Sequence, residues 1–139
     1  MTSRRCVVLE QGVREQLQRA GYTVQTVPPV FSKRLPPAHL IATRGAGETR
    51  YIRIRKISRT EPTVENVEWF LGRDIIRYRT CMERRPAMPG LHYEIWVSTL
   101  RYGITCFEVS KDSVREIPRI PPAAPAPERK PLDAQEGPA

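Results

Sequence analysis

The fold is determined by two apolar runs, His39-Leu-Ile-Ala-Thr43 and Tyr51-Ile-Arg-Ile-Arg-Lys-Ile57, and by the turn Arg44-Gly-Ala-Gly-Glu48 between them. In each run apolar and polar residues alternate with a period of two, which is typical of a half-buried β-strand. The glycine-containing turn reverses the chain, so the two runs predict a hairpin. Since residues two apart on a strand point to the same side, Arg53 and Arg55 are expected on one face.

The residues before the hairpin predict a helix followed by a strand. Positions 8–20 place Leu9, Val13 and Leu17 on one stripe, and Gly21 follows where a left-handed helix cap would lie. Residues 22–27 alternate and are rich in β-branched side chains, as in a strand. Residues 30–38 lie between two Pro-Pro pairs and are predicted to be irregular.

After the hairpin, a second helix is predicted to begin at Thr60 or Thr63 and to reach about Met82, with Gly72 as a point where it could kink or split. Strands at 91–97 and 104–109 follow, and residues 112–117 could form a short final element. The helix between the third and fourth strands is a crossover that makes these strands parallel. The fold class is therefore α/β (α+β), with a mixed central sheet in αβββαββ order flanked by helices.

The chain of 139 residues is long enough for one core. We expect a folded domain at 1–117 and a disordered Pro/Ala-rich tail at 118–139, because seven of the 14 prolines and almost no large apolar side chain fall in that tail. The tail is electrically neutral, so the net charge of +8 belongs to residues 1–117. A basic folded domain attracts polyanions, of which nucleic acid is the commonest. A basic surface that serves only solubility is the alternative.

Three cysteines and two histidines lie too far apart along the chain for a zinc motif or a disulfide framework. Cys81 and Cys106 fall in apolar segments and are predicted to be small core residues. The N-terminus has only a brief apolar stretch, which predicts neither a signal peptide nor a membrane span. We therefore expect a cytoplasmic protein with no metal, no cofactor and no membrane contact.

In its order of elements the chain resembles the restriction-endonuclease-like, or PD-(D/E)xK, nuclease superfamily over residues 7 to 110. The resemblance rests on the glycine hairpin, on His39-Leu-Ile-Ala42 where members have Asp-Leu-Ile-Ala, and on Ile52-Arg53-Ile54-Arg55 where members have Ile-Glu-x-Lys. In active members the Asp and Glu bind magnesium and the Lys assists the attacking water. All three positions differ here, and arginine cannot ligate a cation. The resemblance thus implies a nuclease-like fold without nuclease chemistry, a pseudonuclease.

Three functions follow as hypotheses. The first is a non-catalytic protein that binds the phosphate backbone of nucleic acid, DNA in preference to RNA, through a basic groove. The second is a protein-interaction or scaffolding module, with a homodimer as an open alternative. The third is a divergent nuclease in which a helix carboxylate (Glu10, Glu15, Glu65 or Glu68) has replaced the lost ones. For the first, the predicted nucleic-acid-binding residues are His39, Arg50, Arg53, Arg55, Lys56 and Arg59.

Two structural alternatives compete with this assignment. Arg53 and Arg55 could instead pair with Glu10, Glu94 or Glu65 and only hold the sheet to its helices. The aromatic residues Trp69, Phe70, Trp96 and Tyr102 could stack on bases, although filling the core or covering its edge is the commoner role of such side chains.

Overall fold

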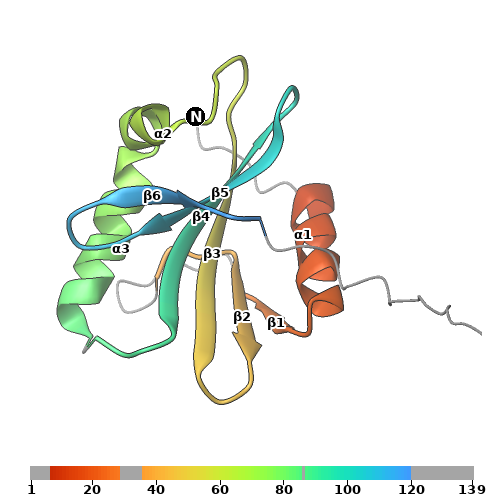
Figure 1. Cartoon of the computed structure of the whole chain (residues 1–139), viewed down its shortest axis with the longest axis vertical. Helices are drawn as coiled ribbons and strands as arrows, with labels where there is room; N and C mark the ends of the chain where they lie inside the picture. The colour runs from red at the N-terminus through yellow and green to blue at the C-terminus, as the bar shows by residue number, and fades with distance from the viewer. Residues whose placement is uncertain (1–6, 29–35, 86, 120–139) are drawn as a thin grey trace, which may run out of the picture.

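The computed structural model describes residues 7–28, 36–85 and 87–119. It contains one six-stranded mixed sheet with helices on both faces (Figure 1). Helix α1 (Val7–Arg19) lies on one face, and helices α2 (Val64–Phe70) and α3 (Gly72–Arg84) lie on the other. The predicted mixed α+β class is confirmed; the second predicted helix is split in two, and the short final element is a sixth strand.

The sheet contains its strands in sequence order: β1 (Thr23–Thr26), β2 (Leu40–Arg44), β3 (Glu48–Lys56), β4 (Leu91–Thr99), β5 (Gly103–Val109) and β6 (Val114–Ile117). All neighbours are antiparallel except β3 and β4, which are parallel as the crossover predicted. The final element is therefore an edge strand. Residues 120–139, most of the predicted tail, lie outside the described part, as do residues 30–35 of the segment predicted to be irregular.

Local signals place the helix ends where the sequence indicated. Gly21 has a φ of 96°, the left-handed conformation expected after α1. The Thr63 hydroxyl accepts a hydrogen bond from the Asn66 backbone N–H, 3.1 Å away, and so caps α2. The second predicted helix is divided at Leu71, immediately before Gly72. Of the two predicted starting points, Thr63 is the residue that caps α2, and Thr60 is not.

Two apolar clusters pack on the two faces of the sheet. Even-numbered residues of β3, including Ile52 and Ile54, pack with Val13 and Leu17 of α1. Odd-numbered β4 residues such as Ile95 pack with α2 and α3. This alternation assigns every polar residue of β3 and β4 to one face or the other.

Candidate nucleic-acid interface

Arg53 and Arg55 lie on the α3 face of β3 and share one carboxylate. The Nε of Arg55 donates to Oδ2 of Asp74 at 2.7 Å, and Nη2 of Arg55 donates to Oδ1 at 3.1 Å. The Nε of Arg53 lies 3.3 Å from Oδ1 of the same aspartate. Asp74 lies in the first turn of α3 and is only 3% exposed. The two arginines therefore fasten the sheet to α3 through Asp74.

The Arg53 guanidinium is incompletely satisfied. Its Nη1 donates to the Pro37 carbonyl at 3.0 Å, but its buried Nε has no hydrogen-bond partner of good geometry among the described residues. Burial lowers the pKa of Arg53, and the Asp74 charge opposes this shift, while the neighbouring charges of Arg55 and Arg77 add to it. Positive charge thus exceeds negative charge around Asp74.

His39 has a structural role. It is 7% exposed, and its Nδ1 accepts a hydrogen bond from the Ile54 backbone N–H at 3.0 Å. An Nδ1 that accepts a hydrogen bond carries no proton, so the imidazole is neutral in this arrangement. His39 lies opposite Arg53, as β2–β3 pairing requires, but its buried ring adds no positive charge to a phosphate site.

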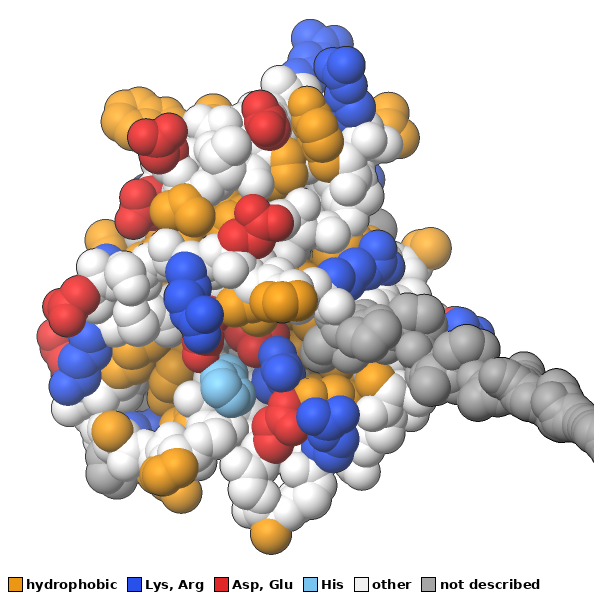
Figure 2. Space-filling view, viewed as in Figure 1, with side chains coloured by type: hydrophobic (Ala, Val, Ile, Leu, Met, Phe, Trp, Pro, Cys, Tyr) orange, Lys and Arg blue, Asp and Glu red, His pale blue; other side chains and the backbone are white. Residues whose placement is uncertain are grey.

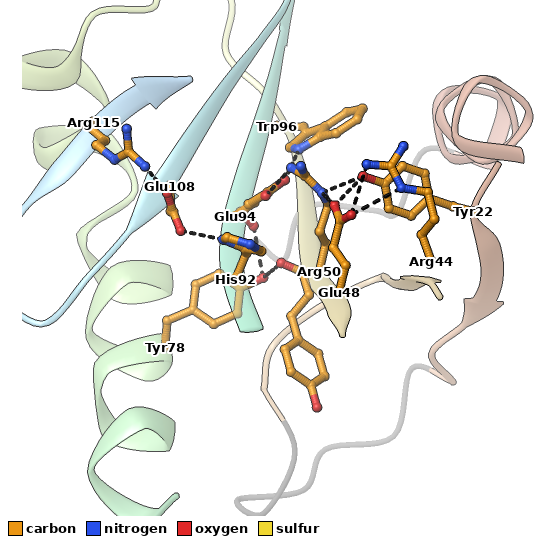
Figure 3. A network of polar contacts seen from close by, with 11 residues as sticks. Tyr22, Arg44, Glu48, Arg50, Tyr78, His92, Glu94, Trp96, Glu108 and Arg115 are labelled. Atoms are coloured by element: carbon orange, nitrogen blue, oxygen red, sulfur yellow. Dashed lines mark hydrogen bonds and ion pairs between the residues drawn. The ribbon is translucent and has the colours of Figure 1, made fainter. Parts of the chain in front are cut away.

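Arg50 lies on the other face of the sheet, so the expectation that it joins Arg53 and Arg55 is wrong. Arg50 is three positions from Arg53, and an odd separation on a strand reverses the side; by the same rule the even-numbered Lys56, at the end of β3, also lies on the α1 face. Its guanidinium is hydrogen-bonded to Tyr22, Glu48 and Glu94 beside the α1 cluster (Figure 3). Burial tends to lower the pKa of Arg50, but Glu94, Glu48 and Tyr22 outweigh it and raise the pKa.

Figure 3 shows two groups of polar side-chain contacts on this α1 face. In one, Tyr22 and Arg44 contact Glu48, and Trp96 Nε1 donates to Glu94 at 2.9 Å. In the other, Glu108 lies 2.8 Å from His92 Nδ1 and 2.6 Å from Arg115. Each carboxylate in the network faces at least one basic group. Trp96, which donates to Glu94 and is only 1% exposed, is a core residue.

Of the six predicted site residues, Lys56 and Arg59 have exposed side chains and form no ion pair within the described part of the chain. They follow Arg55 directly, at the end of β3 and in the loop after it. Asp74, which organises Arg53 and Arg55, was missed because it is 19 residues from Arg55 in sequence. An acidic residue in the first turn of a helix usually signals only helix stabilisation.

The carboxylates considered as replacements lie elsewhere. Glu10 is in α1, on the face opposite Arg53 and Arg55, and it is 9% exposed with interactions of its own. Glu15 is exposed on the same helix, and Glu65 and Glu68 are exposed on α2. Within the described ranges no group of three or more His, Cys, Asp or Glu side chains could hold a metal ion. Nor does any described helix have the length and hydrophobicity to cross a membrane.

No protein-family model matches the sequence, and no curated protein matches it. Among the solved structures that match is Hjc, a Holliday junction resolvase of Archaeoglobus fulgidus, an archaeal hyperthermophile. It is 14% identical, the match covers 81% of this chain and 87% of that chain, and the TM-score is 0.48. Identity at this level says nothing about activity or substrate.

Proposed function

We propose that the protein binds the phosphate backbone of nucleic acid without cleaving it, through a basic surface at the C-terminal end of β3. We define the β3 basic surface as Arg53 and Arg55 on the α3 face of β3, Lys56 at the end of the strand on its α1 face, and Arg59 in the loop that follows. The observation that carries the proposal is the sharing of one buried carboxylate, Asp74, by Arg53 and Arg55. Arg53 and Arg55 together carry one positive charge more than Asp74 neutralises, and Lys56 and Arg59 add two exposed cations just after them in the chain, with Glu61 as the acidic residue of that loop.

The chemistry of these side chains supports binding rather than hydrolysis. Guanidinium and ammonium groups supply hydrogen-bond donors and no lone pair for a cation. They suit phosphate oxygens, which accept charge-assisted hydrogen bonds. The Asp74 carboxylate beside Arg53 and Arg55 is already neutralised by these two arginines. The side chains of Arg53 and Arg55 are 16% and 24% exposed, so each is partly accessible to solvent.

Lys56 and Arg59 provide a sharper test than Arg53 and Arg55. Charge reversal at Arg53 or Arg55 would place a carboxylate against buried Asp74 and destabilise the fold, which would confound a binding measurement. Lys56 and Arg59 are exposed, so Lys56→Glu/Arg59→Glu changes the surface and spares the core. Lys111→Glu is a matched control, because Lys111 is exposed on the turn between β5 and β6, at the other end of the sheet.

The experiment measures fluorescence anisotropy of labelled branched DNA over a salt series with magnesium present, and each sample is checked for cut strands. We expect intact strands and an affinity that falls steeply with salt. The Lys56→Glu/Arg59→Glu variant should reduce the slope of log K against log[salt] by about 2, and Lys111→Glu should change it little. A competition series should favour DNA over RNA. Absence of binding at low salt, or an unchanged slope in the double variant, contradicts the proposal; cut strands would favour a nuclease with a displaced carboxylate.

A protein-interaction module is the second candidate, and exposed apolar side chains on α2 and α3 favour it. Trp69 is 81% exposed, Phe70 is 54% exposed and Ile76 is 64% exposed. Of the roles considered for Trp69 and Phe70, filling the core is therefore wrong, while covering its edge and stacking on bases stay open. Light scattering of the wild type and of Trp69→Ala/Phe70→Ala tests self-association: a dimer that becomes a monomer in the variant supports this candidate, while a wild-type monomer removes the homodimer alternative.

A further inference from the structure

Two loops project from the same end of the sheet. One, residues 57–63, follows β3, and the other is the β4–β5 hairpin tip, residues 100–102. Because β3 and β4 are parallel, with Lys56 paired to Ser98, their C-terminal ends coincide. Figure 1 shows the two loops side by side at the top of the molecule. Figure 2 shows a group of Lys and Arg side chains over this end.

In the hairpin tip an exposed aliphatic residue, Leu100, precedes Arg101, and an exposed aromatic residue, Tyr102, follows it. Leu100 is fully exposed, and Tyr102 is 48% exposed. The guanidinium carbon of Arg101 lies 5.8 Å from the centroid of the Tyr102 ring. The Thr99 hydroxyl accepts a hydrogen bond from the Tyr102 backbone N–H at 2.9 Å, which fixes the tip. The tip therefore presents Tyr102 from a defined backbone, away from both apolar clusters.

The neighbouring loop supplies cations in a constrained backbone. Arg59 has a φ of 61°, the only described residue other than glycine with a positive φ. Such a conformation is unfavourable for a side chain-bearing residue and persists at functional sites more often than elsewhere. Arg59 is exposed in this loop, Lys56 is exposed at the end of β3 just before it, and Glu61 is the one acidic residue of the two loops. Arg101, Lys56 and Arg59 thus lie at the same end of the sheet as the exposed Leu100 and Tyr102.

We propose that these two loops form a site for nucleic acid in which unpaired bases adjoin a duplex, as at a fork. In this site Tyr102 stacks on an unpaired base, Leu100 covers the last base pair, and Arg101, Lys56 and Arg59 contact the flanking phosphates. This inference rests on the proposed function and names its substrate class. Stacking needs a base whose face is open, and inside a duplex both faces are covered by neighbouring pairs. A rigid aromatic ring beside cations is the chemistry that recognises such a base in single-stranded nucleic acid.

The test compares two labelled DNAs of equal length and charge, one fully paired and one forked, with 2-aminopurine at the first unpaired position. Anisotropy gives the affinity, and 2-aminopurine fluorescence reports stacking at that base. The variant is Leu100→Ala/Tyr102→Ala, whose side chains are exposed. The control is Met88→Ala, another exposed apolar residue (61%) at the opposite end of β4. Circular dichroism verifies that each variant is folded.

We expect the wild type to bind the fork more tightly than the duplex and to quench 2-aminopurine. Leu100→Ala/Tyr102→Ala should lose roughly tenfold in affinity for the fork and abolish the quenching, with duplex affinity changed less than about twofold. Met88→Ala should behave as wild type. Equal wild-type affinity for the two DNAs, or fork binding unaffected by the double variant, overturns the inference and leaves the proposed backbone binding intact. Failure to bind either DNA at low salt overturns both.

Discussion

Nη1 of Arg50 lies 2.5 Å from Oε2 of Glu94, whose side chain is completely buried. The Trp96 indole N–H donates a hydrogen bond to the Glu94 carboxylate, and the Glu94 backbone carbonyl accepts a hydrogen bond from the Tyr78 hydroxyl at 3.0 Å. Arg50 also contacts Glu48, so the pair joins β3 to β4, and the Tyr78 hydroxyl connects it to α3 on the other face of the sheet. A buried ion pair of this kind contributes little net free energy when intact, but removal of one partner leaves an uncompensated charge.

Arg50→Ala should therefore lower the free energy of unfolding by about 3 kcal/mol or more, because it leaves the Glu94 carboxylate buried and unpaired. Urea denaturation at neutral pH measures this. Arg50→Met/Glu94→Leu removes both charges and should recover most of the loss. A double variant that is less stable than Arg50→Ala would show that the pair itself stabilises the fold.

Asp74→Asn should affect stability and DNA binding in opposite directions. Loss of the shared carboxylate leaves Arg53 and Arg55 repelling each other, so we expect the free energy of unfolding to fall by about 2 kcal/mol. The same change removes one negative charge from the β3 basic surface and should steepen the slope of log K against log[salt] by about 1. Asp112→Asn, an exposed residue on the β5–β6 turn, is the control. If Asp74→Asn left the salt slope unchanged, phosphate would not be contacting Arg53 and Arg55.

The stability of the protein should depend on Glu48 in acid. Burial opposes ionisation of Glu48, but hydrogen bonds from Tyr22 and Arg50 and the charge of Arg50 outweigh it and lower the pKa from 4.5 to about 2. A carboxyl whose folded pKa is lowered stabilises the fold above its unfolded pKa, and this contribution is lost as the pH falls from about 4.5 to about 2. Urea midpoints measured across this range should decline less steeply in Glu48→Gln than in the wild type.

Glu94→Gln should have the opposite effect on that pH profile. Burial is the main cause of the raised pKa of Glu94, and the charge of Arg50 only partly counteracts it. A carboxyl with a raised folded pKa favours the folded state at low pH and loses this contribution as the pH rises through its folded pKa. Its removal should make the decline on acidification steeper. A flatter profile in Glu94→Gln would mean that Arg50 dominates and that the folded pKa is lowered.

Gly90→Ala should be strongly destabilising. Gly90 has a φ of 81°, and a Cβ there would lie 1.6 Å from the Gly47 carbonyl oxygen. Its own carbonyl accepts a hydrogen bond from the Thr49 N–H at 2.8 Å, so the loop before β4 packs against the β2–β3 turn without room for a side chain. We expect a loss of about 3 kcal/mol or more, measured by thermal or urea unfolding.

Gly12→Ala is the matched control for that substitution. Gly12 is exposed within α1, and nothing lies within 4 Å of the added Cβ. Alanine there should increase the free energy of unfolding by about 0.5 to 1 kcal/mol through helix propensity alone. Equal effects of the two substitutions would mean that the close approach of Gly90 to Gly47 does not persist in solution.

Much of the fold could be predicted because its signals are local. The alternation around Leu40 and Ile52 predicted the hairpin, Gly21 predicted the end of α1, and Gly72 predicted the break between the second and third helices. Cys81 and Cys106 are buried, at 5% and 1% exposure, as their apolar segments indicated. Burial also raises the pKa of the Cys106 thiol to about 12. These features depend on residues within a few positions of one another, so the sequence contains them directly.

The candidate site depended on the tertiary structure. By itself the sequence determined that cations occupy the end of β3 and that Arg53 and Arg55 share a face. Their partner is Asp74, 19 residues from Arg55, while Arg50 pairs with Glu94, 44 residues away. Strand register and helix packing choose such partners, and neither is encoded in the residues next to them. Only the folded chain therefore decided that Arg53 and Arg55 are held by an aspartate, whereas Lys56 and Arg59 remain exposed to solvent.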